Sequence, residues 1–323
     1  MRSNCSLYVD AGYLLASAAT RVTGTSLRNG IHVEFGKLID SLIAQAEEIC
    51  DLSVLRVHWY DSAKDGVPDP QQERIGELSK VKLRLGRFGV DGQQKGVDLR
   101  IGLDLVTHAR HGAADVFFLV SGDDDLTEAV EEAQVHGVQV VVLAVPSTDG
   151  KAHGVSRHLV RAADQVVLVR EESIDGTVLK VEAPAVTTAA QPAPAMAAPS
   201  ARSVAPSPMD LAGKGRPAAA APSAVLAYSG TTGGSSQVQP GYEPLDEYDE
   251  QIDSVVRKVL DSFRKSAAPQ ELQAISLSRP SIPRDIDRAL LLDLCDALGI
   301  YDLRDAIRFR LRDHFWEVWE ESA

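Results

Sequence analysis

The feature that most restricts the fold is a regular alternation of short apolar runs and amphipathic stretches across residues 6–169. The apolar runs have the length of strands, and several of them, such as Val138–Val145, are apolar almost throughout. Runs of this kind are typical of parallel strands that are buried on both faces of a sheet. The stretches between them repeat apolar residues at helical spacing. This alternation predicts an α/β fold, with a parallel sheet between two layers of helices.

The elements can be placed by their residue ranges. We expect strands at 6–10, 53–60, 81–88, 116–121, 138–145 and 165–169. We expect helices at 34–50, 71–79, 96–110, 126–136 and 156–163. Apolar and basic residues alternate in 81–88, which indicates a half-exposed or edge strand. Ligands of parallel α/β sheets bind outside the carboxyl ends of the strands, so polar residues that directly follow a strand are the first candidates for a site.

A change in composition at residue 183 divides the chain. Of the 58 residues in 183–240, 42 are Ala, Pro, Ser, Gly or Thr, and these bury too little apolar surface to offset the entropy of ordering. We therefore predict a disordered linker between a domain at 1–182 and a domain at 241–323. Apolar residues at helical spacing in the last block predict a small all-α domain, in which Gly299 ends one helix as a C-cap.

Charge and cysteine content exclude several classes of protein. The net charge is −13, from 33 Lys and Arg against 46 Asp and Glu, so we do not expect nucleic acid to be held tightly by bulk charge. An acidic protein can still handle phosphates through metal ions. Three scattered cysteines form neither a disulfide framework nor a zinc motif, which favours the cytoplasm. The apolar runs are too short to cross a bilayer, so we expect no membrane association.

Several aspartates stand where the predicted fold would place a ligand site. Asp10 ends the first expected strand, Asp123 and Asp125 follow the strand at 116–121, and Asp98 opens a helix. Carboxylates gathered in one cleft repel one another and raise each other's pKa, unless a cation neutralises them. Hard oxygen ligands suit Mg²⁺ or Mn²⁺, which bridge to phosphate oxygens. The pattern thus favours a divalent-metal site that acts on phosphates.

Each of these acids also has an ordinary structural interpretation. An Asp after a strand often caps a helix, and Asp125 fits the first position of a capping box. Asp98 would be favoured by the positive end of its helix in any case. Asp104 lies six residues past Asp98, about 120° around the helix, so direct metal contact and a supporting role stay equally open. The metal interpretation gains because Asp10, Asp98 and Asp123 belong to three separate elements at one edge of the sheet.

Four short motifs occur in a fixed order in the first half of the chain. They are Tyr8-Val-Asp-Ala-Gly-Tyr-Leu14, Gln94-Lys-Gly-Val-Asp-Leu-Arg-Ile-Gly-Leu-Asp104, Phe118-Leu-Val-Ser-Gly-Asp-Asp-Asp-Leu126 and Val155-Ser-Arg-His-Leu-Val-Arg-Ala-Ala-Asp164. In this order, residues 6 to about 170 resemble the NYN domain, a branch of the PIN-like nucleases. The resemblance implies a three-layer α/β/α, Rossmann-like fold of the PIN type. It also implies metal-dependent cleavage of RNA at clustered aspartates.

The resemblance assigns the site residue by residue. Asp10 matches the acid of the first strand, Asp98 the acid after Lys-Gly-Val, and Asp123 and Asp125 the acids of the Ser-Gly-Asp-x-Asp motif. Asp104 matches a further acid that is often present in the second motif. These residues would be the metal ligands and the catalytic residues of the domain.

The chain departs from the family pattern at three positions. The first motif usually reads Asp-x-x-Asn, and Tyr13 replaces the Asn, so its amide contact is lost or supplied by another group. Leu126 replaces the usual aromatic residue. Asp124 stands where a small polar residue is common, and we expect it to point into solvent. None of these changes removes an expected carboxylate.

The resulting hypothesis is a ribonuclease in which one or two Mg²⁺ or Mn²⁺ ions activate a water for attack on an RNA phosphate. Lys95, together with Lys82, Arg84 and Arg87, could contact the RNA backbone. For Lys95 a solvated lysine at the start of a helix is the favoured interpretation, and for the other three basic protection of an edge strand is as ordinary as RNA contact. The alternative is a catalytically silent RNA- or protein-binding module with the same fold.

The last block carries no motif that we assign to a family. RNA positioning, docking of a partner and self-association are all compatible with a small helical domain. Arg304, Arg308, Arg310 and Arg312 could form a basic face, although acids alternate with them. A solvated helix exterior is the ordinary interpretation of that pattern.

Overall fold

The computed structural model describes the chain in five stretches. They are 3–63, 66–88, 94–181, 248–300 and 303–321. The described residues before the predicted linker and those after it belong to one compact unit. The predicted linker at 183–240 lies outside the described residues. The boundaries that we predict for the three domains stay a prediction.

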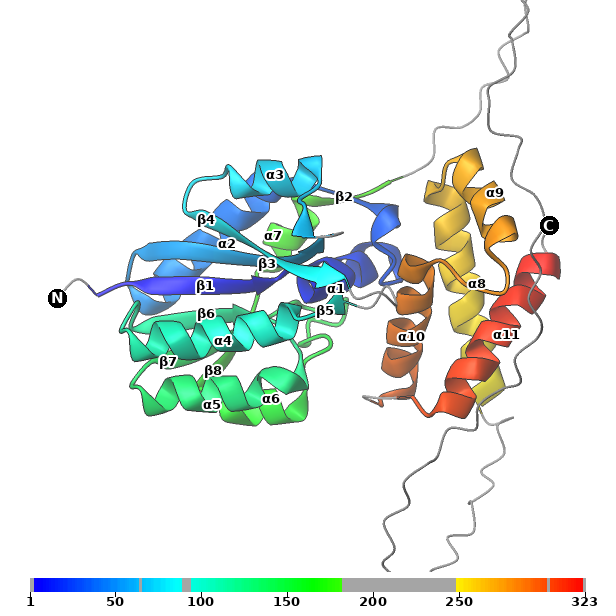
Figure 1. Cartoon of the computed structure of the whole chain (residues 1–323). Helices are drawn as coiled ribbons and strands as arrows, with labels where there is room; N and C mark the ends of the chain where they lie inside the picture. The colour runs from blue at the N-terminus through cyan, green and yellow to red at the C-terminus, as the bar shows by residue number, and fades with distance from the viewer. Residues whose placement is uncertain (1–2, 64–65, 89–93, 182–247, 301–302, 322–323) are drawn as a thin grey trace, which may run out of the picture. The chain divides into compact units, whose positions relative to one another are not determined.

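In the described part, a seven-stranded sheet forms the centre of the α/β region (Figure 1). Across the sheet, the strands are β5 (Gln94–Lys95), β4 (Val81–Phe88), β3 (Val54–Ala63), β1 (Cys5–Asp10), β6 (Val116–Val120), β7 (Gln139–Ala144) and β8 (Gln165–Leu168). Every neighbouring pair is parallel except β4 and β5. All six expected strands are present, and the predicted parallel sheet is confirmed. The expected edge strand is β4, which has only the two-residue β5 beyond it.

The connections between the strands are mostly helical. The helices of this region are α1 (Ala11–Thr23), α2 (Phe35–Cys50), α3 (Pro70–Gly76), α4 (Val97–Arg110), α5 (Thr127–Val135), α6 (Arg157–Ala162) and α7 (Glu171–Asp175), with the 3₁₀ turns η1 (Arg28–Gly30) and η3 (Asp124–Leu126). A separate antiparallel pair joins β2 (Ile31–Val33) to β9 (Val178–Lys180). The sequence pattern indicates five of these helices and misses α1, α7 and the small sheet. Helix α1 is rich in alanine and buried along much of its length, so it lacks the polar face that reveals an amphipathic helix.

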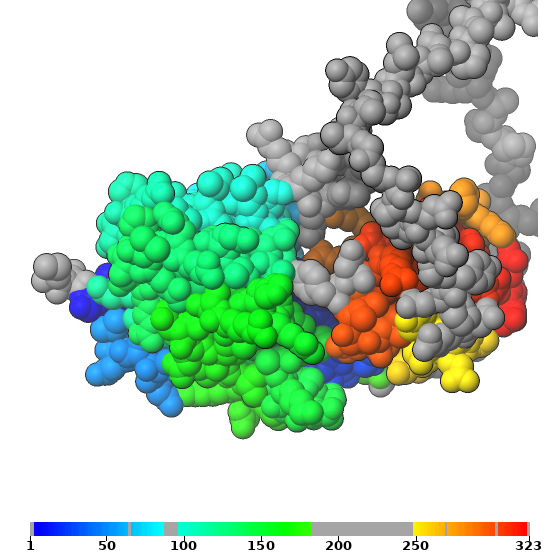
Figure 2. Space-filling model, turned by 90° about the horizontal axis from the view of Figure 1, so that it is seen from below, coloured from blue at the N-terminus to red at the C-terminus, as the bar shows by residue number. Residues whose placement is uncertain are grey.

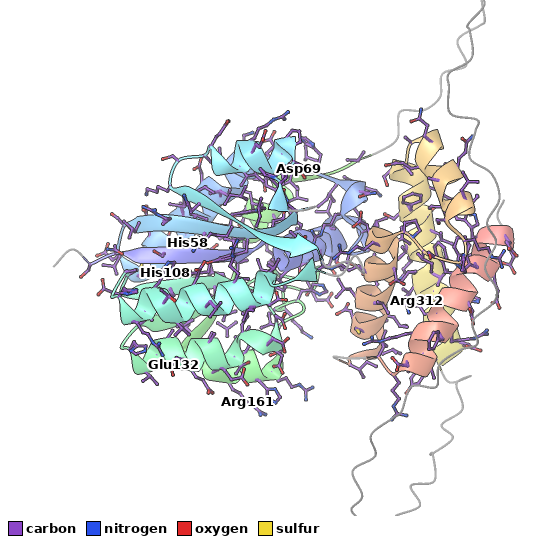
Figure 3. The ribbon with its side chains drawn as sticks, in the orientation of Figure 1. His58, Asp69, His108, Glu132, Arg161 and Arg312 are labelled. Atoms are coloured by element: carbon purple, nitrogen blue, oxygen red, sulfur yellow. The ribbon has the colours of Figure 1, made fainter. Side chains whose placement is uncertain are left out.

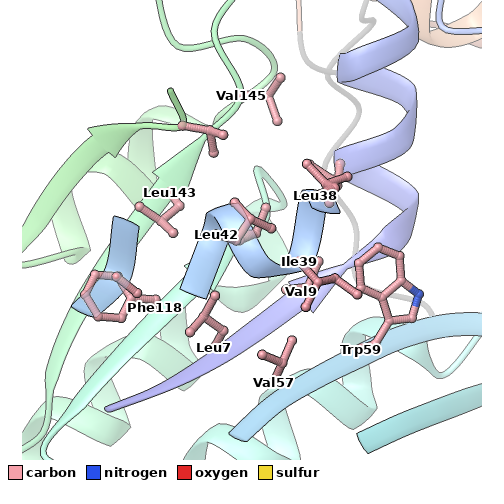
Figure 4. Packing of buried hydrophobic residues seen from close by; sticks show 14 of the residues in the cluster. Leu7, Val9, Leu38, Ile39, Leu42, Val57, Trp59, Phe118, Leu143 and Val145 are labelled. Atoms are coloured by element: carbon pink, nitrogen blue, oxygen red, sulfur yellow. The ribbon is translucent and has the colours of Figure 1, made fainter. Parts of the chain in front are cut away.

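Two apolar cores lie on opposite faces of the sheet, because successive residues of a strand point to opposite sides. On β1, Leu7 and Val9 enter the first core and Tyr8 enters the second. Helices α1 and α2 close the first core, and α4 and α5 close the second. Figure 4 shows strand residues of the first core meeting the apolar face of α2, including Leu38, Ile39 and Leu42. In Figure 2, the green segments, among them α5 and α6, form a continuous face of packed side chains. The predicted three-layer arrangement is confirmed.

The C-terminal part is all-helical, as predicted. Its helices are α8 (Asp249–Ser266), α9 (Pro269–Ser278), α10 (Arg284–Leu298) and α11 (Asp305–Glu321). They share one apolar core, which also includes the fully buried Leu27 from the stretch before η1. Gly299 has a φ of 64° and ends α10 as the expected C-cap. Among the described helices, none combines the length and the apolar character that crossing a membrane requires.

The arginines of α11 are engaged with acids of neighbouring helices. Arg312 donates to Asp287 of α10 at 2.7 and 2.8 Å, and Arg310 lies 3.3 Å from Asp249 of α8 (Figure 3 labels Arg312). Their charge is therefore balanced within the helical part. This arrangement matches the ordinary interpretation of these arginines better than an uncompensated basic face.

Candidate active site

Asp10 combines two roles at the carboxyl end of β1. Its Oδ1 accepts a hydrogen bond from the Gly12 amide at 2.7 Å, so Asp10 is the N-cap of α1. The Ser121 hydroxyl, which directly follows β6, donates to its Oδ2 at 3.4 Å. The residue is only 8% exposed. The structural interpretation of this acid as a helix cap is therefore correct, and it does not exclude a functional role, because the carboxylate also lies at the ligand edge of the sheet.

Asp123 is held by the tight turn that follows β6. Its amide donates to the Ser121 hydroxyl at 3.3 Å, and its Oδ1 accepts from the Asp125 amide at 3.1 Å. Gly122 is required here, because a Cβ at this position would lie 1.8 Å from the carbonyl oxygen of Gly154. The motif Ser-Gly-Asp thus owes its glycine to a close approach of two loops. The turn fixes Asp123 beside the carboxyl end of β1.

Asp98 lies in the first turn of α4 and is half-buried. Burial, together with the negative charges of Asp10 and Asp123, raises the pKa of its carboxyl to about 6. Asp98 therefore lies close enough to Asp10 and Asp123 for their charges to act on it, although the three acids belong to three elements. This is the grouping that the sequence analysis predicts, and no single element could produce it.

Two arginines that the sequence analysis does not identify lie at the same place. A Cβ built on Gly12 would lie 2.8 Å from Asp10 Oδ1, 3.1 Å from Arg288 Nη2 and 3.4 Å from Arg28 Nη2. Arg28 also donates to the Gly12 carbonyl at 2.8 Å. Burial raises the pKa of Asp10, and both guanidiniums oppose that rise. Neither arginine belongs to a motif, so the only sequence signal for them is their charge.

Asp124 and Asp125 behave differently from each other. Asp125 is exposed, and only its amide takes part in the turn. Asp124 was expected to point into solvent, and that expectation is wrong. It accepts hydrogen bonds from the Ser156 hydroxyl at 2.5 Å and from His158 at 3.1 Å, and these partners lower the pKa of its carboxyl. Asp124 therefore ties the turn after β6 to the start of α6.

Asp104 lies in a different environment from Asp98. Its carboxylate accepts from Arg84 Nε at 2.9 Å, from Arg84 Nη2 at 2.7 Å and from the Tyr60 hydroxyl at 2.9 Å. Its charge helps burial to raise the pKa of Tyr60. His58 and His108, whose ring centroids are 4.7 Å apart, lie on the same side of the sheet (Figure 3). The structure thus gives Asp104 a full set of partners of its own.

The remaining predicted contacts with RNA are partly accounted for. Arg84 is engaged by Asp104, whereas Lys82 is exposed on β4. The side chains of Arg87 and Lys95 lie outside the described part of the structure. Contacts of these four residues with RNA stay a prediction.

Tyr13, which replaces the usual Asn of the first motif, connects α1 to the loop after β7. Its hydroxyl donates to the His153 carbonyl at 2.7 Å and accepts from the Val145 amide at 3.1 Å. Burial raises the pKa of this phenol well above its usual range. The residue therefore orders the loop that leads to Ser156, instead of offering an amide to the site.

A parallel α/β sheet with aspartates at its carboxyl edge is the arrangement that the resemblance to the PIN-like nucleases implies. The family model described as the NYN domain matches residues 4–170, more than half of the chain. The chain therefore belongs to the NYN family, and the predicted resemblance is confirmed. Members of this family are typically nucleases, which makes the chain a hydrolase at that coarse level.

Two similar proteins have no described function. The uncharacterized protein y4oD of Sinorhizobium fredii (strain NBRC 101917 / NGR234) is 42% identical over 79 residues, which are 24% of this chain and 37% of the relative. This chain thus spans little more than a third of that relative's length. A crystal structure of a protein of unknown function, VPA0982 from Vibrio parahaemolyticus RIMD 2210633, is 21% identical, with a TM-score of 0.38. That match covers 55% of this chain and 97% of the other.

Proposed function

We propose that the protein is a metal-dependent ribonuclease that hydrolyses RNA phosphodiester bonds at Asp10, Asp98 and Asp123. The observation that carries this proposal is the meeting of Asp98 with Asp10 and Asp123 at the carboxyl edge of the sheet, where burial and then the charges of these two acids raise the pKa of Asp98. Acids that only stabilise a fold are normally paired with basic groups or hydrogen-bond donors. Repelling carboxylates at the ligand edge of a sheet instead favour the binding of a cation.

The donor set fits Mg²⁺ or Mn²⁺. Carboxylate oxygens are the hard ligands that both ions prefer. In the described residues, no group of three His, Cys, Asp or Glu side chains is already disposed around one point as a metal cage. The carboxylates therefore need to draw together, and the positive charge that now lies beside Asp10 comes from arginine. A bound divalent ion would supply Lewis acidity, which favours ionisation of the attacking water and stabilises negative charge on the phosphate.

The residues of this chain supply the positioning. Ser121 and the Gly12 amide orient the Asp10 carboxylate, and the turn after β6 fixes Asp123. Asp125 is exposed beside Asp123, where its carboxylate can contact the ion directly or through a water. Asp104 supports α4 by binding Arg84. The protein's net charge of −13 favours transient engagement of RNA through the ion rather than tight binding through bulk charge.

The test is a cleavage assay on single-stranded RNA with Mn²⁺, comparing the wild type with Asp10→Asn and Asp123→Asn. We expect the wild type to cleave, EDTA to stop cleavage, and both variants to lose at least about 100-fold in rate, since metal assistance contributes several kcal/mol. Asp164→Asn, outside the cluster, is the matched control and should keep its activity. Equal cleavage by all four proteins would indicate a contaminating nuclease and refute the site.

The second candidate is a catalytically silent RNA- or protein-binding module with the same fold. The observation that favours it is the burial of Asp10 against two guanidiniums. A protein that binds RNA without cleaving it in any divalent metal, and whose RNA affinity survives Asp10→Asn, would support this alternative. A role of the C-terminal helices in docking RNA, a protein partner or a second copy stays a prediction, as does the cytoplasmic location.

A further inference from the structure

One side chain of the C-terminal helices lies inside the candidate active site. Arg288 belongs to α10, more than 270 residues after Asp10 in the sequence. Arg288 Nη2 and Asp10 Oδ1 lie 3.1 and 2.8 Å from the same point above Gly12, so these two atoms are less than about 6 Å apart. The charge of Arg288 acts on Asp98 as well, where it opposes the effect of the neighbouring carboxylates. Arg288 therefore faces two of the three proposed metal ligands.

Contacts around residues 26–28 hold α10 in this place. The Ser26 amide donates to Asp293 Oδ1 at 2.9 Å, and the Ser26 hydroxyl donates to the Ala289 carbonyl at 3.5 Å. Leu27 is fully buried among the apolar residues of the C-terminal helices. The position of Arg288 is therefore set by the packing of α10 against residues 26 and 27, and not only by the conformation of the Arg288 side chain.

The environment of Arg288 is crowded with positive charge. Arg28, which also lies beside Asp10, is half-buried, and burial together with the charge of Arg288 lowers the pKa of its guanidinium. Burial and the charge of Arg288 also lower the pKa of Arg284, one turn earlier on α10. Guanidiniums that repel one another stay together only while acids balance them. If a divalent cation neutralises Asp10 and Asp98, the positive charge of Arg288 is no longer balanced by these two acids.

Access to Asp10 is restricted in this arrangement. The residue is 8% exposed, and one of its oxygens already accepts from the Gly12 amide. Asp10 therefore offers little surface to solvent, and two guanidiniums lie beside it. Movement of α10 away from this edge would uncover the acid and remove one of the two positive charges.

We propose that Arg288 is an internal cation that takes the place of the divalent ion at Asp10 and Asp98, so that α10 and the metal exclude each other. This inference rests on the proposed metal site and concerns how the binding of metal to that site is regulated. The C-terminal helices hold the nuclease closed, and the protein opens when a divalent ion, aided by RNA, displaces Arg288. The helical part is then an inhibitor within the same chain.

The test measures Mn²⁺ binding to the full chain by calorimetry, without RNA. Arg288→Gln removes the competing charge, and we expect it to bind Mn²⁺ at least about tenfold more tightly than the wild type. Arg288→Lys retains a positive charge and should bind like the wild type. Arg257→Gln is the matched control, because this arginine of α8 pairs with Asp253 and Glu321 of the C-terminal part. It should also bind like the wild type.

Hydrogen exchange of the amides in α10 and of Ser26 gives a second readout. Saturating Mn²⁺ should accelerate their exchange in the wild type, because the helix leaves its place. Unchanged or weaker Mn²⁺ binding by Arg288→Gln, or unchanged exchange while Mn²⁺ binds, would overturn the inference and leave the proposed ribonuclease intact. Failure of every variant to bind Mn²⁺ would instead refute the metal site itself, and the inference with it.

Discussion

Helix α4 carries two aspartates, six residues apart, whose surroundings are opposite. Asp104 accepts three hydrogen bonds, two from Arg84 and one from Tyr60. Asp98 faces Asp10 and Asp123, and burial and their charges raise its pKa to about 6. The charge of Asp104 is balanced by Arg84. Asp98 instead lies among further negative charges. The comparison teaches that the partners of an acid, rather than its presence in a motif, separate a structural role from a functional one.

The same contrast explains why motif matching alone leaves Asp104 undecided. Both acids belong to the stretch Gln94–Asp104, and a family pattern treats them alike. The bidentate contact with Arg84 uses both oxygens of Asp104. A metal ion would have to displace this arginine to bind there. We therefore assign Asp104 to the support of α4 and β4.

The largest expected effect is a difference in RNA cleavage between variants of Asp98 and of Asp104. Asp98→Asn should lower RNA cleavage with Mn²⁺ by at least about 100-fold, because it removes a metal ligand and its charge. Asp104→Asn should stay within about tenfold of the wild type, as is common when a supporting partner of a metal site is lost. Steady-state rates on one RNA substrate measure both. An equal loss in the two variants would erase the distinction between the two acids.

The reverse order is expected for stability. Asp104→Asn should lower the free energy of unfolding by about 1–3 kcal/mol, since Arg84 loses a charged partner and Tyr60 loses a charged acceptor. Asp98→Asn relieves repulsion and should be at least as stable as the wild type without metal. Urea unfolding in EDTA measures both values. If Asp98→Asn proved the less stable variant, Asp98 would have a structural role that its contacts do not indicate.

A smaller effect is expected at Asp125. Its side chain is exposed, so it can reach a cation only from the solvent side of the cluster. Asp125→Asn should lower cleavage by about tenfold, in the range seen when outer partners of a metal site are removed. The same RNA assay checks this value, with Asp98→Asn measured in parallel. A loss as large as that of Asp98→Asn would place Asp125 among the direct ligands.

The smallest expected effect concerns Asp293 of α10, a half-buried acid of the C-terminal helices whose charge should make stability depend on pH. The pKa of Asp293 is raised from 3.8 to about 6, because burial and the charge of Asp296 outweigh the Ser26 hydrogen bonds and the charge of Lys258. Its Oδ2 is buried and has no hydrogen-bond partner among the residues that the structure describes. A carboxyl whose pKa is higher in the folded state contributes stability below pH 3.8, and this stability is lost as the pH rises through about 6.

Asp293→Asn removes that charge and keeps an acceptor for the Ser26 amide. We therefore expect the variant to gain about 1 kcal/mol over the wild type at pH 8, and to lose this advantage as the pH falls toward 4. Thermal unfolding at several pH values, without metal, gives the difference directly. An advantage that is constant with pH would show that Asp293 does not titrate in this range.

The sequence predicts the parts of the structure that depend on local patterns. Near-continuous apolar runs such as Val138–Val145 predict the parallel sheet, and the sheet places Asp10 and Asp123 at one edge by its geometry alone. Helix α1 is missed because it is rich in alanine and buried along much of its length, so its apolar residues form no distinct stripe. The partner of Asp104 is missed because Arg84 lies on another element, and pairing of this kind depends on tertiary packing.

Arg288 is the extreme case. Its distance from Asp10 along the chain is nearly the whole sequence, and a region of biased composition separates the two. No periodicity, cap or motif connects them. Only the folded chain reveals that a guanidinium of the C-terminal helices lies beside the acid of the first strand.

The central claim is that Asp10, Asp98 and Asp123 share one divalent cation. Crystals of the full chain grown in saturating Mn²⁺ test it most directly, through the anomalous scattering of manganese. The account predicts a manganese peak bonded to oxygens of these three aspartates, with the Arg288 guanidinium moved away from Asp10. A protein that cleaves RNA in Mn²⁺ while its crystals show manganese only at other residues would contradict it.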